Sequence, residues 1–176
     1  TVLILAMVIA LEGGSPFYLQ KRLGRGGKIF TMVKLRTMQI DAERHLSEYL
    51  ARDAQARTEW EAYQKLKNDP RITRIGNFLR KSSMDELPQL WNVLIGDMSL
   101  VGPRPMLPEQ SPLYPGNAYY LLRPGITGPW QVSDRNASTF AQRADFDAAY
   151  ERTLSFTTDV KVLFATVGVV FRCTGK

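Results

Sequence analysis

The sequence SSMDELPQL at residues 82–90 is the most informative stretch of this chain for both fold and function, because it sets two adjacent carboxylates, Asp85 and Glu86, before an apolar segment. Arg80 precedes the pair, and the sequence GPRP at residues 102–105 follows it. In such a setting one acid can attack phosphorus and the other can hold a divalent cation, while arginines neutralise phosphate charge. The stretch therefore favours phosphate chemistry.

The position of Pro88 limits where a helix in this stretch can begin. Proline lacks a backbone N–H, so it is tolerated in a first helical turn but not further in. A helix over residues 85–95 satisfies this condition, whereas a capping box formed by Ser83 and Glu86 would begin the helix slightly earlier. Either start puts both carboxylates at the positive end of the helix dipole, which also attracts phosphate. Capping alone is a simpler role for the pair, but it leaves the neighbouring cations without a function.

Adjacent helical side chains point about 100° apart, so Asp85 and Glu86 cannot both face one atom. This favours a division of labour in which one carboxylate attacks phosphorus and forms an acyl phosphate. The other would bind Mg²⁺, which takes few protein carboxylates and completes its shell with phosphate and water oxygens. Geometry alone leaves both assignments open.

A basic β-hairpin is predicted ahead of the acidic pair. Residues 17–22 and 28–36 are rich in β-branched and aromatic side chains and flank a glycine-rich turn at residues 24–27. Lys34 and Arg36 are two positions apart, so a strand directs both side chains to one face. The turn matches neither the P-loop nor the dinucleotide-binding motif, and a plain hairpin turn is the simpler explanation.

Two arginines lie beside prolines. Arg104 is flanked by Pro103 and Pro105, which restrict the backbone on both sides. An arginine on a stiff backbone loses less conformational entropy when it binds a phosphate bidentately. Arg123 begins a predicted turn at residues 123–128 and is a second candidate phosphate ligand. Exposed linker segments are the alternative explanation for both.

The rest of the chain is predicted to be mostly helical, so that the whole forms a single α+β domain with a small β-hairpin. Residues 41–68 have mixed charges and sparse apolar positions, which is typical of one long helix with a narrow packed stripe. Shorter helices are predicted at residues 75–80 and 141–151, and an irregular proline-rich segment at 102–115. A last helix at 159–171 has an apolar face that would pack against the core or, alternatively, lie on a membrane surface. That face comprises Val160, Leu163, Phe164, Val167, Val170 and Phe171.

Length and composition suit one globular domain with a sizeable core, since 44% of the 176 residues are hydrophobic and 23% are charged. The net charge of +6 indicates an anionic partner, such as nucleic acid, a phosphorylated metabolite or an anionic lipid headgroup. A single cysteine, Cys173, excludes an internal disulfide, and the single histidine, His45, disfavours a structural zinc site.

An apolar run at residues 2–11 opens the chain and ends at the breakers GGSP, residues 13–16. It is shorter than the roughly 20 residues that span a bilayer and lacks the basic flank and cleavage site of a signal peptide. Because residue 1 is threonine and the run begins at once, we expect a fragment that starts within a longer membrane-associated helix. A buried core helix or strand is the alternative.

Taken together, these motifs resemble the small bacterial sugar transferase family, the monotopic phosphoglycosyl transferases. The resemblance runs from about residue 16 to the last helix. The matching stretches are KLRTM at 34–38, LRKSSMDELPQL at 79–90, NVLIGDMSLVGPRP at 92–105 and RPGITG at 123–128. The order and spacing of the second and third stretches are highly specific to this family.

The resemblance implies an enzyme that transfers a sugar-1-phosphate from a UDP-sugar to a polyprenyl phosphate, undecaprenyl phosphate, and releases UMP. It implies that Asp85 is the nucleophile, forming a covalent phosphosugar-aspartate, and that Glu86 binds Mg²⁺. The subgroup that starts exopolysaccharide repeat units with galactose or glucose is similar in having a long helix at the position of residues 41–68.

Other family motifs assign further candidate ligands. The KxRTM motif falls on Lys34 and Arg36, the arginine ahead of the nucleophile on Arg80, and the Pro-Arg-Pro arginine on Arg104. These cations are expected to contact phosphates or to fix the acidic pair. The aspartate that opens the family's last helix corresponds to Asp159.

The resemblance also implies a re-entrant N-terminal helix, of which residues 1–12 are expected to be the end, followed by a catalytic domain at residues 13–176. It implies a location on the cytoplasmic face of the bacterial inner membrane. Phe156 stands where the family usually has tryptophan.

Two other function classes fit parts of the sequence. A basic nucleic-acid-binding module would use the net charge, but the chain lacks a recognition-helix pattern, a zinc motif and an aromatic RNA motif, so we expect no nucleic-acid partner. A non-catalytic peripheral membrane protein would use only the first and last apolar segments. Only the transferase uses the acidic pair and the arginine motifs together. The sequence does not identify the sugar or the oligomeric state.

Overall fold

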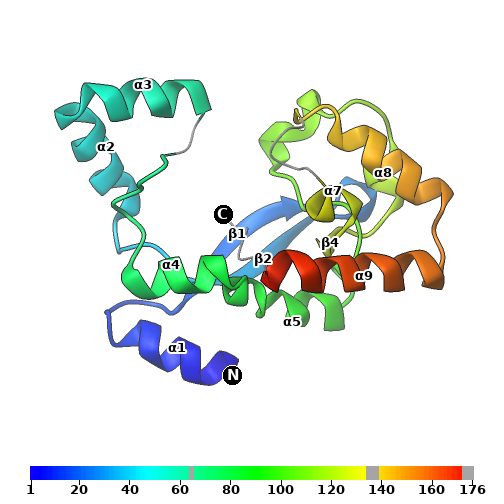
Figure 1. Cartoon of the computed structure of the whole chain (residues 1–176), viewed down its shortest axis with the longest axis horizontal. Helices are drawn as coiled ribbons and strands as arrows, with labels where there is room; N and C mark the ends of the chain where they lie inside the picture. Colours follow the sequence, from blue (N-terminus) through cyan, green and yellow to red (C-terminus); the bar gives the residue numbers. More distant parts are fainter. Residues whose placement is uncertain (64–65, 134–138, 172–176) are drawn as a thin grey trace.

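A computed structural model of the chain describes residues 1–63, 66–133 and 139–171. The predicted α+β class is confirmed, because a small antiparallel sheet and a small parallel sheet are surrounded by helices (Figure 1). In chain order the elements are α1 (Val2–Ala10), β1 (Phe17–Leu23), η1 (Arg25–Gly27), β2 (Ile29–Leu35), α2 (Ala42–Arg52), α3 (Ala54–Tyr63), α4 (Arg74–Lys81), η2 (Met84–Glu86), α5 (Gln89–Leu94), β3 (Ser99–Val101), η3 (Pro108–Leu113), α6 (Ala118–Leu121), β4 (Gly125–Thr127), α7 (Pro129–Val132), α8 (Arg143–Arg152) and α9 (Phe156–Phe171).

The predicted hairpin is confirmed. Strands β1 and β2 pair antiparallel, from Phe17 opposite Leu35 to Leu23 opposite Ile29. The side chain of Asn92 in α5, which is 1% exposed, joins this hairpin through both of its polar atoms. Its Nδ2 donates to the carbonyl oxygen of residue 31 at 2.8 Å, and its Oδ1 accepts from the backbone N–H of residue 33 at 3.1 Å. The amide therefore ties α5 to β2, which sets the acidic pair beside the hairpin.

Helix α1 packs one side against the body of the protein. Ala6 and Ile9 form a buried cluster with Leu35 of β2 and Leu79 of α4. The opposite side of the same helix leaves large apolar side chains exposed, namely Leu3, Ile4, Met7 and Leu11. In the described part of the chain no helix combines the length and the apolar character needed to cross a bilayer.

The prediction of one helix at residues 41–68 is wrong, because the chain breaks at Asp53 into α2 and α3. Asp53 has an extended backbone, with φ −124° and ψ 105°. Its Oδ1 accepts a hydrogen bond from the backbone N–H of Ala56 at 2.9 Å, so it caps α3. Residues 64 and 65 of the predicted helix lie outside the described part. Figure 1 shows α2 and α3 projecting together from one end of the molecule.

The predicted helix at residues 85–95 is only partly right. Met84–Glu86 forms the 3₁₀ turn η2, and α5 begins at Gln89 after Pro88. Ser83 adopts a left-handed conformation, with φ 56°, and its side chain makes no capping hydrogen bond. The capping box is therefore absent, and the acidic pair lies in a tight turn ahead of α5 rather than in its first turn.

The prediction of a turn at residues 123–128 is wrong, because strand β4 lies within this range. Strand β4 pairs in parallel with β3, which lies just before the Pro-Arg-Pro segment in the sequence. This pairing needs glycine at residues 102 and 125, because the two backbones are so close that neither position has room for a side chain. A Cβ at Gly102 would lie 2.3 Å from the carbonyl oxygen of Arg123, and one at Gly125 would lie 2.2 Å from the amide nitrogen of Gly102. The segment at 102–115, predicted as irregular, contains the 3₁₀ helix η3.

The short helices predicted at residues 75–80 and 141–151 are present as α4 and α8. Helix α9 is also present, but its predicted packing face is wrong. Val162 is buried and the Thr166 hydroxyl lies 2.7 Å from that of Thr127, whereas Phe164 is 75% exposed. Apolar residues occur nearly all round this helix, so their spacing alone did not determine the buried side. Leu163 and Val167 are exposed as well; the side chain of Phe171 and the whole of Cys173 fall outside what the structure describes.

Candidate active site

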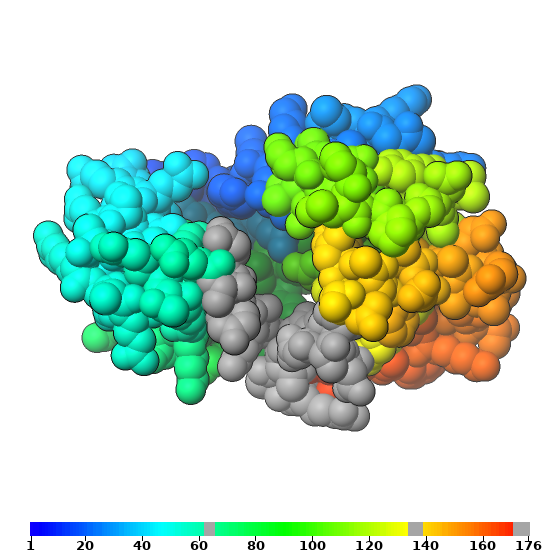
Figure 2. Space-filling view, turned by 90° about the horizontal axis from the view of Figure 1, so that it is seen from above, coloured from blue at the N-terminus to red at the C-terminus, as the bar shows by residue number. Residues whose placement is uncertain are grey.

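A large open cavity, with a volume of about 1390 Å³, lies beside the hairpin and the acidic pair. Its lining comes from β2, the start of α2, α4, η2 and α9, so it is assembled from segments far apart in the sequence. Figure 2 shows the surface recessed between α2–α3, in cyan and turquoise, and α8, in yellow and orange. Of the residues predicted for the site, the lining includes Lys34, Arg36, Arg80, Asp85, Glu86 and Arg104.

An ion pair links the hairpin to the acidic pair. Lys34 Nζ in β2 lies 2.7 Å from Glu86 Oε1 in η2. The two side chains are 19% and 22% exposed, so solvent screens this pair less than it screens a surface ion pair. Lys34 thereby fixes the orientation of the Glu86 carboxylate at the wall of the cavity.

Asp85 lies in the same turn and is partly buried. Burial raises the pKa of its carboxyl group above the ordinary value of 3.8. The charge of Lys34 acts in the opposite direction, Glu86 adds to the increase, and Arg80 again opposes it. A carboxyl group with a perturbed pKa, in a cavity and among cations, is a candidate for chemical function. When ionised, such a group is also more basic than an exposed aspartate.

Arg80 is held between the hairpin end and the acidic pair. Its Nε donates a hydrogen bond to Thr37 Oγ1 at 2.8 Å, and the backbone N–H of Thr73 bonds the carbonyl of Thr37 at 3.1 Å. Burial lowers the pKa of the Arg80 guanidinium, while Asp85 and Asp69 oppose that change. Arg80 is among the residues that line the cavity, and an anchored guanidinium there is a candidate ligand for phosphate.

Arg36 and Lys34 both line the cavity, as their spacing predicts. Arg36 Nη2 donates to the carbonyl of Ile9 at 3.0 Å, which connects the end of α1 to the site. Among the described residues, the buried Nε of Arg36 has no hydrogen-bond partner.

Arg104 lines the main cavity and also a small chamber next to it, of about 20 Å³. Lys34, Glu86 and Arg22 contribute to the same chamber. Arg22 was missed in the sequence, because an arginine on an alternating strand carries no local signal of function. Thr37, which anchors Arg80, was missed although it belongs to the KLRTM stretch.

Two predicted ligands lie elsewhere. Arg123 is exposed, and Asp159 accepts a hydrogen bond from the Tyr150 hydroxyl at the junction of α8 and α9. Neither is among the described residues that line the cavity. The structure therefore brings together the acidic pair and four of the predicted cations, and it separates Arg123 and Asp159 from them.

Comparison with known proteins shows that the bacterial sugar transferase family matches residues 1–173. The chain belongs to this family. Among its curated relatives, the UDP-galactose-lipid carrier transferase of Erwinia amylovora is 47% identical over 176 residues, which is 99% of this chain and 37% of that protein. The undecaprenyl-phosphate galactose phosphotransferase of Salmonella typhimurium is 48% identical over 169 residues, or 95% of this chain and 36% of that protein.

A shorter relative shows how much of a family member this chain represents. The exopolysaccharide production protein ExoY of Rhizobium meliloti is 43% identical over 171 residues, which is 96% of this chain and 76% of that protein. The chain thus spans little more than a third of the two longer relatives and most of the shorter one. In each case the match covers at least 95% of this chain and so extends over residues 17–105.

Proposed function

We propose that this chain carries the catalytic site of a phosphoglycosyl transferase, which moves a sugar-1-phosphate from a UDP-sugar to undecaprenyl phosphate. The observation that carries the proposal is that Asp85 and Glu86 line one cavity together with Lys34 and Arg80. The names of the relatives, which refer to UDP-galactose, a lipid carrier and undecaprenyl phosphate, support the substrate classes. Galactose and glucose are the proposed sugars, and the start of an exopolysaccharide is the proposed context.

The reaction has two displacements at the sugar-bearing phosphorus. In the first, a carboxylate oxygen of Asp85 attacks this phosphorus, the bond from phosphorus to the bridging oxygen breaks, and UMP leaves with the electron pair. In the second, a phosphate oxygen of the polyprenyl phosphate attacks the same phosphorus and the Asp85 carboxylate is released. A covalent phosphosugar-aspartate thus divides one difficult transfer into two.

The cations around Asp85 suit this chemistry. Lys34 and Arg80 oppose the effect of burial on the Asp85 carboxyl, and so favour the ionised nucleophile. Arg36 and Arg104 line the same cavity and can bind the phosphate oxygens, whose charge increases as UMP departs. We assign positioning of the acidic pair to Lys34 and phosphate binding to the three arginines.

The donor set at the acidic pair fits Mg²⁺ when substrate is present. The described residues contain no group of three or more acidic, histidine or cysteine side chains able to hold a metal by themselves. Mg²⁺ is commonly held by one or two carboxylates plus phosphate oxygens, and Glu86 supplies a hard oxygen ligand of this kind. Bound there, the ion would neutralise charge on the diphosphate. Lys34 bonds Glu86 Oε1 and so holds this carboxylate at the wall of the cavity.

Membrane contact is part of the proposal because the acceptor is a lipid. Large apolar side chains are exposed on three helices: Leu3, Ile4, Met7 and Leu11 on or next to α1, Leu90, Trp91 and Leu94 on α5, and Phe156 and Phe164 on α9. Figure 1 shows α1 and α5 along the lower edge of the molecule, beneath the hairpin. Exposed apolar side chains on these helices, in a basic chain, suit the anionic cytoplasmic face of the bacterial inner membrane. Flotation with vesicles that contain anionic lipid tests this contact.

The decisive experiment incubates the full-length protein with Mg²⁺ and UDP-galactose or UDP-glucose labelled in the sugar, without acceptor. We expect a labelled protein, release of UMP, and loss of the label when undecaprenyl phosphate is added. Asp85→Asn should take up no label, whereas Asp145→Asn, an exposed aspartate on α8, should label normally. Unchanged activity in Asp85→Asn would refute the proposed mechanism, and retained activity with a chelator present would refute the role of Mg²⁺.

A further inference from the structure

The backbone of the Pro-Arg-Pro segment is bonded by side chains from elements that are distant in sequence. Arg143 Nη2 in α8 donates a hydrogen bond to the carbonyl oxygen of Arg104 at 2.7 Å. Arg22 Nη1 in β1 donates to the carbonyl of Pro105, the next residue, at 3.0 Å. Consecutive carbonyls of one short segment are thus bonded by side chains from two different elements, α8 and β1.

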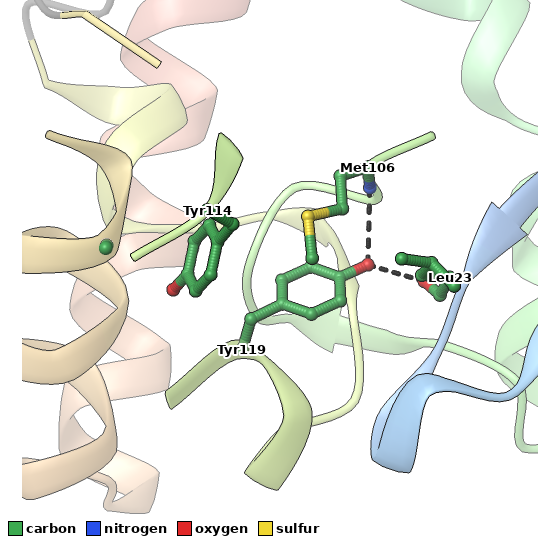
Figure 3. Packing of buried hydrophobic residues seen from close by; sticks show 5 residues of the cluster. Leu23, Met106, Tyr114 and Tyr119 are labelled. Carbon is green, nitrogen blue, oxygen red and sulfur yellow. Dashed lines mark hydrogen bonds between the residues drawn. The ribbon is translucent and has the colours of Figure 1, made fainter. Parts of the chain in front are cut away.

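A third side chain holds the residue that follows. The Tyr119 hydroxyl accepts a hydrogen bond from the backbone N–H of Met106 at 3.2 Å and donates one to the carbonyl of Leu23 (Figure 3). Tyr119 is fully buried, and its ring packs among Tyr114, Met106 and Leu23. The hydroxyl therefore joins the Pro-Arg-Pro segment to the end of β1.

Arg143 is itself held rigidly. It is 6% exposed, and its guanidinium lies 4.9 Å from the ring centres of both Trp130 and Phe140. The Asp147 carboxylate lies nearby on the same helix and accepts a hydrogen bond from the Tyr114 hydroxyl at 2.9 Å. Burying a guanidinium and a carboxylate involves a desolvation penalty that an apolar cluster would avoid. A purely structural explanation leaves this choice of residues unexplained.

The bond from Arg143 ends at Arg104 itself, which is the residue that reaches the cavity. Arg143 is not among the described residues that line the cavity, so we expect it to act on a ligand there through Arg104 rather than by direct contact. Rotation of the peptide group after Arg104 would swing the Arg104 side chain, and the hydrogen bond to its carbonyl opposes that rotation. Small displacements of this kind can reduce catalysis strongly.

We propose that Arg143 and Tyr119 are positioning residues, which act through the backbone of residues 104–106 to aim the Arg104 guanidinium at the phosphates of the substrate. The inference rests on the proposed function, in which Arg104 binds phosphate. It assigns to α8 and α6, which lie outside the cavity, a specific part in substrate binding.

The test is a double-mutant cycle in the full-length protein. Arg143→Met removes the donor but keeps much of the side-chain volume, and it is measured alone and combined with Arg104→Ala. We expect Arg143→Met to lower kcat/KM for UMP release at least about tenfold and to change kcat and KM in the same directions as Arg104→Ala. The double variant should be no more than about twofold worse than Arg104→Ala, because both changes remove one interaction. Arg143→Lys should retain more activity than Arg143→Met.

Controls separate positioning from folding. Arg152→Met removes an exposed arginine from the same helix and should leave kcat/KM unchanged. If Arg143→Met does not fold, Tyr119→Phe, which keeps the buried ring, replaces it in the cycle. If the fold-losses in kcat/KM of the two single variants multiply in either double variant, the proposal is wrong.

A binding measurement distinguishes this inference from the proposed function. If the wild type released no UMP from any UDP-sugar, the proposed function would fail. Equilibrium binding of UDP would then decide the positioning role, because UDP carries the phosphates without the sugar. If the wild type and Arg143→Met bind UDP with equal affinity, Arg143 is not a positioning residue. If Arg143→Met binds UDP more weakly, and adding this change to Arg104→Ala causes no further loss of affinity, the positioning role is supported.

Discussion

Lys34 Nζ lies 2.7 Å from Glu86 Oε1, and this contact joins strand β2 to the turn that contains Asp85. Lys34 also makes the largest of the contributions that lower the pKa of Asp85, against burial, which raises it. One cation thus serves two neighbouring carboxylates. It orients the first by a direct bond and favours the ionised form of the second.

Replacing Lys34 by methionine should move the acid limb of the pH–rate profile to higher pH. Without the cation the pKa of Asp85 rises further, and the rate falls as pH decreases through that pKa because the proposed nucleophile must be ionised. The measurement is the rate of covalent labelling between about pH 3 and 8, a range that brackets ordinary and raised carboxyl pKa values. Lys21→Met is the control, since Lys21 bonds Thr31 on an exposed part of the hairpin. An acid limb at the same pH in Lys34→Met would contradict the prediction.

Asp85→Asn should lose activity by at least about 10³-fold, the scale seen when a nucleophile is removed, and yet be more stable than the wild type. The folded-state pKa of Asp85 lies above 3.8, so the folded state binds this proton more tightly than the unfolded state does. Ionisation at higher pH therefore destabilises the fold, and asparagine avoids this effect. Thermal melting should show a higher Tm for the variant at neutral pH, with the difference vanishing below about pH 3.8. A lower Tm for Asp85→Asn than for the wild type at pH 7 would show that burial is not the dominant influence on the pKa of Asp85.

Gly76→Ala should destabilise the protein by about 1–3 kcal/mol, the range for overpacked sites. A Cβ there would lie 2.0 Å from the carbonyl oxygen of Thr37. Thr37 also accepts the hydrogen bond from Arg80, so UMP release should fall as well. Urea unfolding measures the stability. Gly168→Ala in α9 is the matched control: no described atom lies within 4 Å of its Cβ position, and alanine there should stabilise the helix by about 0.5–1 kcal/mol.

Asp147→Asn should stabilise the protein above about pH 6 but not near pH 4. Burial raises the pKa of Asp147 from 3.8 to about 6, so its contribution to stability is lost as pH rises between these values. The difference corresponds to about 3 kcal/mol. Asparagine resembles the protonated acid and can still accept the hydrogen bond from Tyr114. Unfolding free energies of both proteins at pH 4 and pH 8 check the prediction, and an equal difference at both values would contradict it.

The local features of the site were predictable from sequence because they depend on near neighbours. Alternating β-branched and aromatic residues around glycines determine the hairpin, and spacing alone directs Lys34 and Arg36 to the cavity. The acidic pair can be recognised as a sequence motif, but the backbone conformation around it cannot be predicted from that motif. Ser83 occupies a left-handed conformation that neither helix propensity nor capping rules favour for serine, so η2 could not be predicted.

Other errors came from contacts between distant segments. Residues 123–128 contain Pro and Gly and resemble a turn, yet Gly125 is needed where β4 meets β3. Asp53 suits a helix N-cap, but the helix-forming residues on both sides hide the break between α2 and α3. Arg143 lies in an ordinary amphipathic helix, and only the fold reveals its bond to Arg104.

The contact between Gly102 and Gly125 has a consequence for engineering. In both cases a methyl group would meet main-chain atoms rather than side chains, so no rotamer change nearby could make room. A library that randomises either position should yield survivors that keep glycine, whatever else varies around them. The two segments that pair there can accordingly be exchanged between relatives only as a matched set.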